Sequence, residues 1–213
     1  MLVFLVGEGP SDIGDLSSSP SYRNGGEGFF QPLIRTMLGD CDFDGQKVTA
    51  LGKRKMKGAK SALGRKAAIA AALAQALEAD ILVYSMDADH AFARRSAELV
   101  QYLQGQDLPF AVAVAKQTIE AWVMGDPSAV AAIETGVAPP TKPENLWGKP
   151  SEPDSNHPKQ FIRRLVDRNP NREDFAAAGA AALPSQLCQQ CPESFRPFAD
   201  QISSFSGHLP CTP

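Results

Sequence analysis

The chain has 213 residues, 43% of them hydrophobic, and a formal net charge of −3. This composition predicts one globular domain and excludes a polycationic protein, so any nucleic-acid binding must depend on a local basic patch. The N-terminal run MLVFLV is too short for a signal peptide and has no basic flank, and no stretch reaches the roughly 20 apolar residues of a membrane span. We therefore expect a cytoplasmic protein without a membrane segment.

Short apolar runs alternate with amphipathic stretches in the first half of the chain. Runs ended by glycine or aspartate indicate buried strands, and apolar residues spaced three or four apart indicate helices. The elements expected up to residue 104 are a strand at 2–6, a Ser/Gly/Pro-rich loop at 17–28, a helix at 29–38, a strand at 47–51, a basic loop at 53–66, a helix at 67–79, a strand at 81–86 and a helix at 92–104.

The alternation continues with a strand at 110–115 and a helix at 118–126. It predicts an α/β fold with a mostly parallel, Rossmann-like sheet and helices on both faces. From residue 138 the composition shifts to Pro, Asn, Ser and charged residues, which predicts a loop at 138–158. A helix at 161–167 and a Pro-rich tail, anchored by Phe195, Phe198, Ile202 and Phe205, follow. We expect a core at 1–137 and a loop-rich C-terminal extension at 138–213, packed as a single compact unit.

Two aspartates, Asp87 and Asp89, end the apolar run ILVYSM. In extended chain they point the same way, and adjacent carboxylates repel unless a cation lies between them. Mg²⁺ prefers such oxygen ligands. The alternative is that both are ordinary loop or helix-cap residues, for which aspartate is common.

Glu8 favours the metal interpretation. It follows the first strand in GEGPSDIG, and the carboxyl ends of parallel strands are where ligands bind. Asp12, one helical turn further on, could add a weaker ligand. The segment matches neither the phosphate-binding P-loop nor the dinucleotide fingerprint GxGxxG.

EGPSD at 8–12 and DAD at 87–89, each after a strand, resemble the acidic motifs of a Toprim domain. IEAWVMGDPSAV at 119–130, LWGKP at 146–150, HPK at 157–159 and CPESFRPF at 191–198 resemble segments of the small Toprim-like DUF4276 family, related to nucleases of the overcoming-lysogenization-defect type. The resemblance spans most of the chain.

The resemblance implies Mg²⁺ or Mn²⁺ and phosphodiester chemistry on nucleic acid, with DNA favoured over RNA. Glu8 would be a metal ligand or general acid/base, Asp87 and Asp89 would hold metal, and Glu120 would complete the cluster. It also implies an effector of bacterial anti-phage defence that works with a separate ABC/AAA-type ATPase. Nothing matches a topoisomerase's catalytic tyrosine or a primase's extra modules, so hydrolysis is the favoured reaction.

Seven cations and no acid lie between positions 53 and 66: Lys53, Arg54, Lys55, Lys57, Lys60, Arg65 and Lys66. Such a run can contact a phosphate backbone, although a solvated surface loop is the plainer interpretation. Lys159 is a candidate catalytic or phosphate-positioning residue, unless it is simply solvated. His90 could contact metal or phosphate, or be a loop residue.

The cysteines pose a separate question. In a reducing compartment we expect thiols or a metal site rather than disulfides. Cys188, Cys191, His208 and Cys211 have an order that could bind zinc, but buried apolar cysteines are the alternative.

Three functions remain open: a metal-dependent nuclease, a non-catalytic module that binds nucleic acid or a partner, and a phosphohydrolase of small nucleotides. The basic run disfavours the third, since a mononucleotide does not need seven cations. The sequence leaves open the strand preference, endo- or exonuclease action, the need for an ATPase and the oligomeric state.

Overall fold

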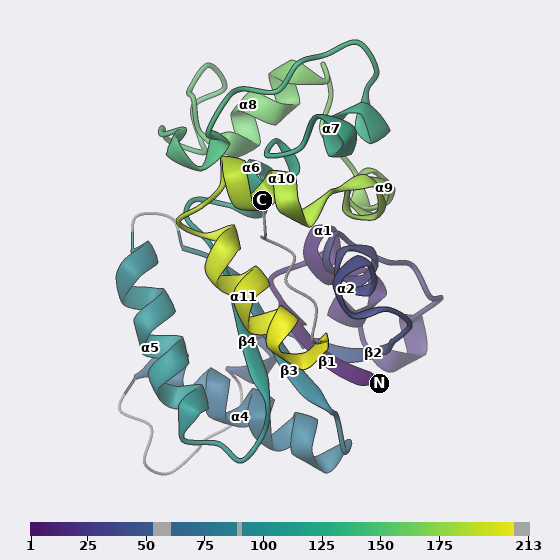
Figure 1. The fold of residues 1–213 in the computed structure, drawn as a ribbon, viewed down its shortest axis with the longest axis vertical. Coiled ribbons are helices and arrows are strands. Elements are labelled where there is room, and N and C mark those ends of the chain that lie inside the picture. The colour runs from purple at the N-terminus through teal and green to yellow at the C-terminus, as the bar shows by residue number, and fades with distance from the viewer. Residues whose placement is uncertain (53–60, 89–90, 207–213) are drawn as a thin grey trace.

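The fold is built on one parallel sheet. The computed structural model describes residues 1–52, 61–88 and 91–206. Four strands pair in the order β2-β1-β3-β4, all parallel (Figure 1). Their bounds are β1 Leu2–Gly7, β2 Asp42–Lys47, β3 Ile81–Asp87 and β4 Phe110–Ala115. The predicted α/β, Rossmann-like arrangement is confirmed.

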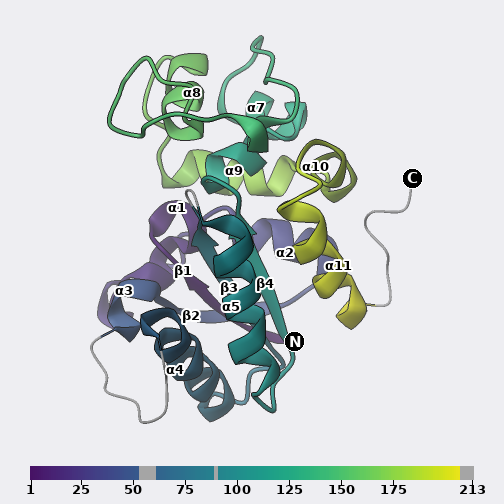
Figure 2. The same cartoon turned by 90° about the vertical axis from the view of Figure 1, so that its left-hand side faces the viewer.

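Helices cover both faces of this sheet. Helices α4 (Ala62–Ala76) and α5 (Phe92–Gln104) pack on one face, and α2 (Phe30–Leu38) and α11 (Phe195–Ser206) pack on the other (Figure 2). Alternate strand residues divide accordingly: Val83 contributes to the core beneath α2 and α11, whereas Leu82 and Tyr84 contribute to the core beneath α4 and α5. Side chains at alternate positions point to opposite faces, so two cores share one sheet.

The remaining helices position the carboxyl edge of the sheet. They are α1 Pro10–Ile13, α3 Val48–Leu51, α6 Ile119–Val123, α7 Pro127–Ile133, α8 Pro158–Leu165, α9 Arg172–Ala181 and α10 Pro184–Gln190, with 3₁₀ turns at Gly14–Ser17, Pro20–Tyr22 and Pro143–Asn145. Helices α6 to α10 gather beyond the carboxyl ends of the strands (Figure 1). A ligand bound at those ends would therefore lie between the sheet and this helical lobe.

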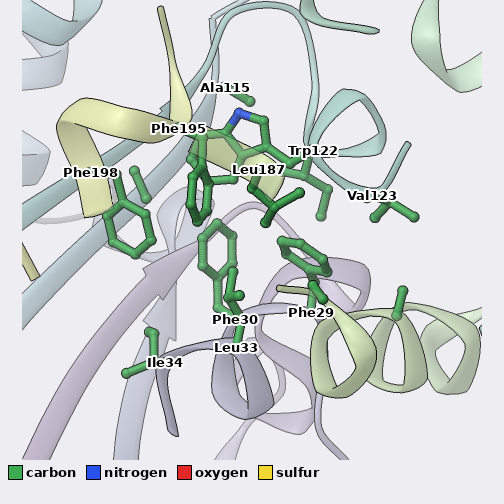
Figure 3. Close-up of a cluster of buried hydrophobic side chains, with 14 of the residues drawn as sticks. Phe29, Phe30, Leu33, Ile34, Ala115, Trp122, Val123, Leu187, Phe195 and Phe198 are labelled. Carbon is green, nitrogen blue, oxygen red and sulfur yellow. The ribbon is translucent and has the colours of Figure 1, made fainter. Parts of the chain in front are cut away.

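An aromatic cluster joins the lobe to the sheet (Figure 3). Trp122 of α6 is fully buried; it stacks on Phe198, with centroids 5.8 Å apart, and meets Phe195 edge-on at 5.1 Å. Phe30 of α2 packs edge-on against Trp122 at 5.9 Å and against Phe198 at 6.1 Å. Aromatic groups from α2, α6 and α11 thus share one core, which fixes α6 over the end of β4.

The prediction of a strand at 47–51 is wrong. Residues 48–51 form helix α3, in which Val48 and Leu51, three apart, are buried against the α4 side. The strand lies just before it, as the polar segment DFDGQK. Because β2 is an edge strand paired only with β1, it needs little apolar surface, and its composition gave no strand signal.

Most other predicted elements are confirmed, with shifted ends, but the prediction of a loop-rich C-terminal extension is wrong, because α9, α10 and α11 follow α8. The helix predicted at 67–79 spans 62–76, so residues 62–66 are helical and not part of a loop. Ser61 accounts for this start, since its hydroxyl accepts a hydrogen bond from the backbone N–H of Gly64 at 2.9 Å. The predicted tail anchors Phe195, Phe198 and Ile202 are buried, and Phe205 packs partly against them. Residues 138–157 form a loop with one short 3₁₀ turn, and α8 begins at Pro158.

Within residues 1–52, 61–88 and 91–206, no helix combines the length and the apolar character needed to span a bilayer.

Replacing Phe30 should test the aromatic cluster. Phe30→Ala would leave a cavity among Phe29, Trp122 and Phe198, and we expect it to lower the free energy of unfolding by about 3–5 kcal/mol, measured by urea denaturation. The matched control is Tyr22→Ala, an aromatic side chain that is 78% exposed, which should change stability by less than about 0.5 kcal/mol. Similar losses for the two variants would contradict a core centred on Phe30.

Candidate active site

Asp87 is the central acid at the carboxyl edge of the sheet. It ends β3 and is 9% exposed. Its Oδ1 accepts a hydrogen bond from the backbone N–H of Ile119 at 3.1 Å, and its Oδ2 accepts one from the Lys159 ammonium at 3.1 Å. The side chain therefore faces α6 and α8, as its position in the alternation along β3 requires.

Glu8 and Asp12 lie beside it, at the end of β1. The Asp12 carboxylate accepts a hydrogen bond from the backbone N–H of Glu8 at 2.7 Å, and the Glu8 carboxylate accepts one from the backbone N–H of Asp87 at 3.3 Å. Gly7 makes this close packing possible, because a Cβ there would lie 2.5 Å from Ile13 Cγ2 and 3.1 Å from Asp12 Cβ. Glu8 is exposed whereas Asp12 is buried.

Glu120 approaches the same acids from the first turn of α6. Its negative charge contributes to raising the pKa values of both Asp87 and Asp12, which places it in the cluster. Its Oε2 atom is buried and has no hydrogen-bond partner in the described chain. The same is true of Ser85 Oγ, Gln117 Oε1 and Thr118 Oγ1, which belong to residues near Asp87 or Ile119 in the chain. Buried polar atoms normally have partners, so this edge has binding capacity that the described chain does not use.

Lys159 brings the positive charge from a distant part of the sequence. His157 caps α8 with its ring, which accepts a hydrogen bond from the Lys159 backbone N–H at 3.3 Å, and Pro158 occupies the first helical position. The cap sets the direction of the helix and so the reach of Lys159 toward Asp87. The lysine side chain remains 45% exposed.

Burial and mutual repulsion dominate the electrostatics of the cluster. Desolvation raises the pKa of Asp12 to about 7, opposed by its hydrogen bond from Glu8 and reinforced by the charges of Glu120 and Glu8. Desolvation, followed by the charge of Glu120, raises the pKa of Asp87 well above its ordinary value. Burial tends to lower the pKa of Lys159, but the charges of Asp87 and Glu120 more than reverse this. The acids compete for one ammonium, and a further cation would relieve them.

The donor set suits a hard divalent cation. All four acids offer oxygen ligands, and the unpartnered Glu120 Oε2 adds an acceptor. The described acids do not form a complete coordination shell in this structure. Among the described residues, no three His, Cys, Asp or Glu side chains form a group that could hold a metal ion. Lys159 is bonded to Asp87 Oδ2, so metal binding there would require that oxygen to be shared or released.

The structure thus brings together five of the predicted site residues: Glu8, Asp12, Asp87, Glu120 and Lys159. Asp89 and His90 lie outside the described residues, as do the basic residues Lys53, Arg54, Lys55, Lys57 and Lys60. Arg65 and Lys66 are on α4.

Of the four residues that could bind zinc, the structure describes only Cys188 and Cys191. Cys188 is disulfide-bonded, so its sulfur is not a zinc ligand and the expectation of thiols is wrong for it. Cys191 is a buried free thiol that belongs to the same hydrophobic core as the aromatic cluster. Its sulfur lies 3.7 Å from the Ala121 carbonyl oxygen. His208 and Cys211 lie outside the described residues.

Arg95 and His157 are site residues that the sequence did not single out for these roles. Arg95 of α5 donates from Nη1 to the Asp87 carbonyl oxygen at 2.7 Å. Its position one turn into the helix that follows the DAD motif could have indicated that it reaches the site. An arginine at that position is equally typical of a solvent-exposed helix face, however. His157 was visible in HPK, where a residue before proline can cap a helix.

Comparison with protein-family models, with curated proteins and with solved structures found no match.

The raised pKa of Asp12 predicts a distinct dependence of stability on pH. The folded chain keeps a proton that the unfolded chain releases above its ordinary pKa of 3.8, so this group's contribution to the free energy of unfolding falls as pH rises from about 4 to about 7. Asp12→Asn removes the penalty and can still accept the Glu8 hydrogen bond. In metal-free buffer we expect it to stabilise the fold by on the order of 2 kcal/mol at about pH 8, and little at about pH 4, by urea denaturation.

Asp15 provides the control with the opposite sign. Hydrogen bonds from the Asn24 and Gly26 backbone lower its pKa, so Asp15→Asn should reduce stability at about pH 8 and much less at low pH. If Asp12→Asn also lowered the stability at about pH 8, the inference that ionising the buried Asp12 carboxyl destabilises the fold would be wrong.

Proposed function

We propose that the chain is a metal-dependent nuclease that hydrolyses phosphodiester bonds. The observation that carries the proposal is the convergence of four carboxylates and one lysine at the carboxyl edge of a parallel sheet, with Asp87 at the centre. That edge is where parallel α/β proteins bind ligands, and acids with perturbed pKa values are typical of functional sites. The proposal also rests on the resemblance of the acidic motifs to a Toprim domain.

Asp87, Glu120, Glu8 and Asp12 would hold Mg²⁺ or Mn²⁺, joined by Asp89 if the resemblance extends to it. A bound divalent cation would neutralise the phosphate, lower the pKa of a bound water and stabilise the leaving oxygen. The unpartnered Glu120 Oε2 and the raised pKa values of Asp12 and Asp87 support this use of the acids.

Among the described residues of the cluster, Glu8 and Lys159 have the exposure needed to act on substrate. Glu8 is exposed at the strand end, so its carboxylate can accept a proton from an attacking water. The Lys159 side chain is 45% exposed while its ammonium is bonded to Asp87 Oδ2, and the ammonium can donate to a phosphate oxygen. Asp87 orients Lys159 and is itself oriented by the backbone N–H of Ile119.

The biological setting in this proposal comes from the resemblance alone. It comprises nucleic acid as substrate, with DNA favoured over RNA, and an effector role in anti-phage defence with a separate ABC/AAA-type ATPase.

A non-catalytic binding module is the second candidate. The Lys159–Asp87 ion pair favours it, because a permanent ammonium at Asp87 would neutralise that acid without a metal. The two candidates differ in whether cleavage accompanies binding.

Cleavage assays separate them. Purified protein with Mn²⁺ or Mg²⁺ should cleave at least one of plasmid, linear duplex, single-stranded DNA and single-stranded RNA, as followed on gels. We expect Asp87→Asn to reduce the rate by about a hundredfold or more, and Lys159→Met to reduce it by a factor of about ten or more.

Asp126→Asn is the matched control, because Asp126 is equally buried but caps α7 away from the cluster. It should retain the wild-type rate wherever it folds, as checked by circular dichroism. Cleavage by Asp87→Asn at the wild-type rate, or no cleavage of any substrate by the wild type, would contradict the nuclease.

A further inference from the structure

A pocket of about 440 Å³ opens beside Glu8 on the α4/α5 face of the sheet. Met86, whose side chain belongs to the core on that face, forms part of its floor. The pocket therefore lies on the opposite side of β3 from the Asp87 carboxylate and Lys159. Its polar lining residues are Glu8, Ser61, Lys66, Arg94, Arg95 and Glu98.

The walls of this pocket are fixed by contacts between α4 and α5. The Ser61 hydroxyl caps α4 and donates a hydrogen bond to the Glu98 carboxylate of α5. One turn further, Gly64 allows the Tyr102 ring to approach, since a Cβ at position 64 would lie 2.2 Å from that ring. Glu98 is thus engaged with Ser61, and the first turn of α4 is held against the middle and last turns of α5.

The cations in the pocket differ in how the described chain engages them. Arg95 is oriented by its bond to the Asp87 carbonyl oxygen. Lys66 and Arg94 have no ion pair or hydrogen bond within the described chain. Two of the three arginines of another surface pocket, which α8 lines, are engaged by the chain: Arg164 donates to the carbonyl oxygens of Pro153 and Ser155, and Arg168 pairs with Asp174.

The lining also indicates what would be recognised. Guanidinium and ammonium groups bind phosphate, and an arginine can do so through two parallel hydrogen bonds. The described lining contains no aromatic side chain on which a base could stack; its apolar members are Val48, Ala62, Leu63 and Met86. Recognition of a phosphate rather than of a base follows.

We propose that Lys66, Arg94 and Arg95 bind a backbone phosphate of a nucleic-acid strand, one that flanks the phosphate held at Asp87. Glu8, which lines the pocket and bonds to Asp87, marks where the strand would pass from one site to the other. The flanking position rests on the proposed nuclease function, but phosphate binding by the three cations does not require a metal.

Binding in EDTA tests this without any cleavage. Fluorescein-labelled single-stranded DNA and RNA of the same short sequence would be titrated with wild type, Lys66→Ala, Arg94→Ala and Arg94→Lys, by anisotropy over a series of salt concentrations. We expect Lys66→Ala and Arg94→Ala each to weaken binding about fivefold and to reduce the slope of log K against log salt by about 0.7. Arg94→Lys should retain the wild-type slope.

Arg163→Ala is the matched control, since Arg163 is an exposed arginine of α8 whose side chain has no partner in the described chain. It should bind as the wild type does. Wild-type affinity and slope in Lys66→Ala and Arg94→Ala, an equal loss in Arg163→Ala, or no binding by the wild type would each overturn the proposal. If the wild type cleaves no substrate but Lys66→Ala and Arg94→Ala still weaken binding, the phosphate site is supported and only the proposed nuclease function is contradicted.

Discussion

The hydrogen bonding of Asp87 is the constraint on which the carboxyl edge depends. Its backbone N–H bonds to Glu8, its carbonyl oxygen to Arg95, and its two carboxylate oxygens to the Ile119 N–H and to Lys159. One residue at the end of β3 thereby joins β1, α5, α6 and α8. Burying a carboxylate is costly unless it is hydrogen-bonded, and here each polar group of the residue has a partner.

This arrangement carries an excess of negative charge. Among the described residues, Asp12, Asp87, Glu120 and Glu8 share the ammonium of Lys159, and burial together with mutual repulsion raises the pKa values of Asp12 and Asp87. Burying Asp12, whose pKa rises to about 7, costs stability, so stability alone does not account for an acid at this position. Binding sites commonly sacrifice stability in this way, and the aromatic core around Trp122, on the same helix as Glu120, provides a rigid support for it.

The sequence predicted the centre of the fold because its signals were local. β3 and β4 are continuous apolar runs, and the parallel arrangement then required Glu8 and Asp87 to meet at one edge. The edge strand β2 was missed because it is polar and paired on one side only.

Contacts between distant segments could not be foreseen. Lys159 is 72 residues from Asp87 along the chain, and only the packing of α8 against α6 brings it there. The pocket between α4 and α5 likewise depends on how closely Tyr102 approaches Gly64. The sequence around Lys66 and Arg94 does not distinguish them from ordinary solvent-exposed lysines and arginines on helices.

Isothermal titration of Mn²⁺ into the purified protein and into Asp87→Asn tests the central claim most directly. If the acids at this edge form a cation site, the wild type should bind Mn²⁺ and release protons at about pH 7, because Asp12 and Asp87 must ionise, and Asp87→Asn should lose that binding. Equal binding by both proteins, or none by the wild type, would mean that Lys159 alone balances Asp87 and that the cluster does not hold metal.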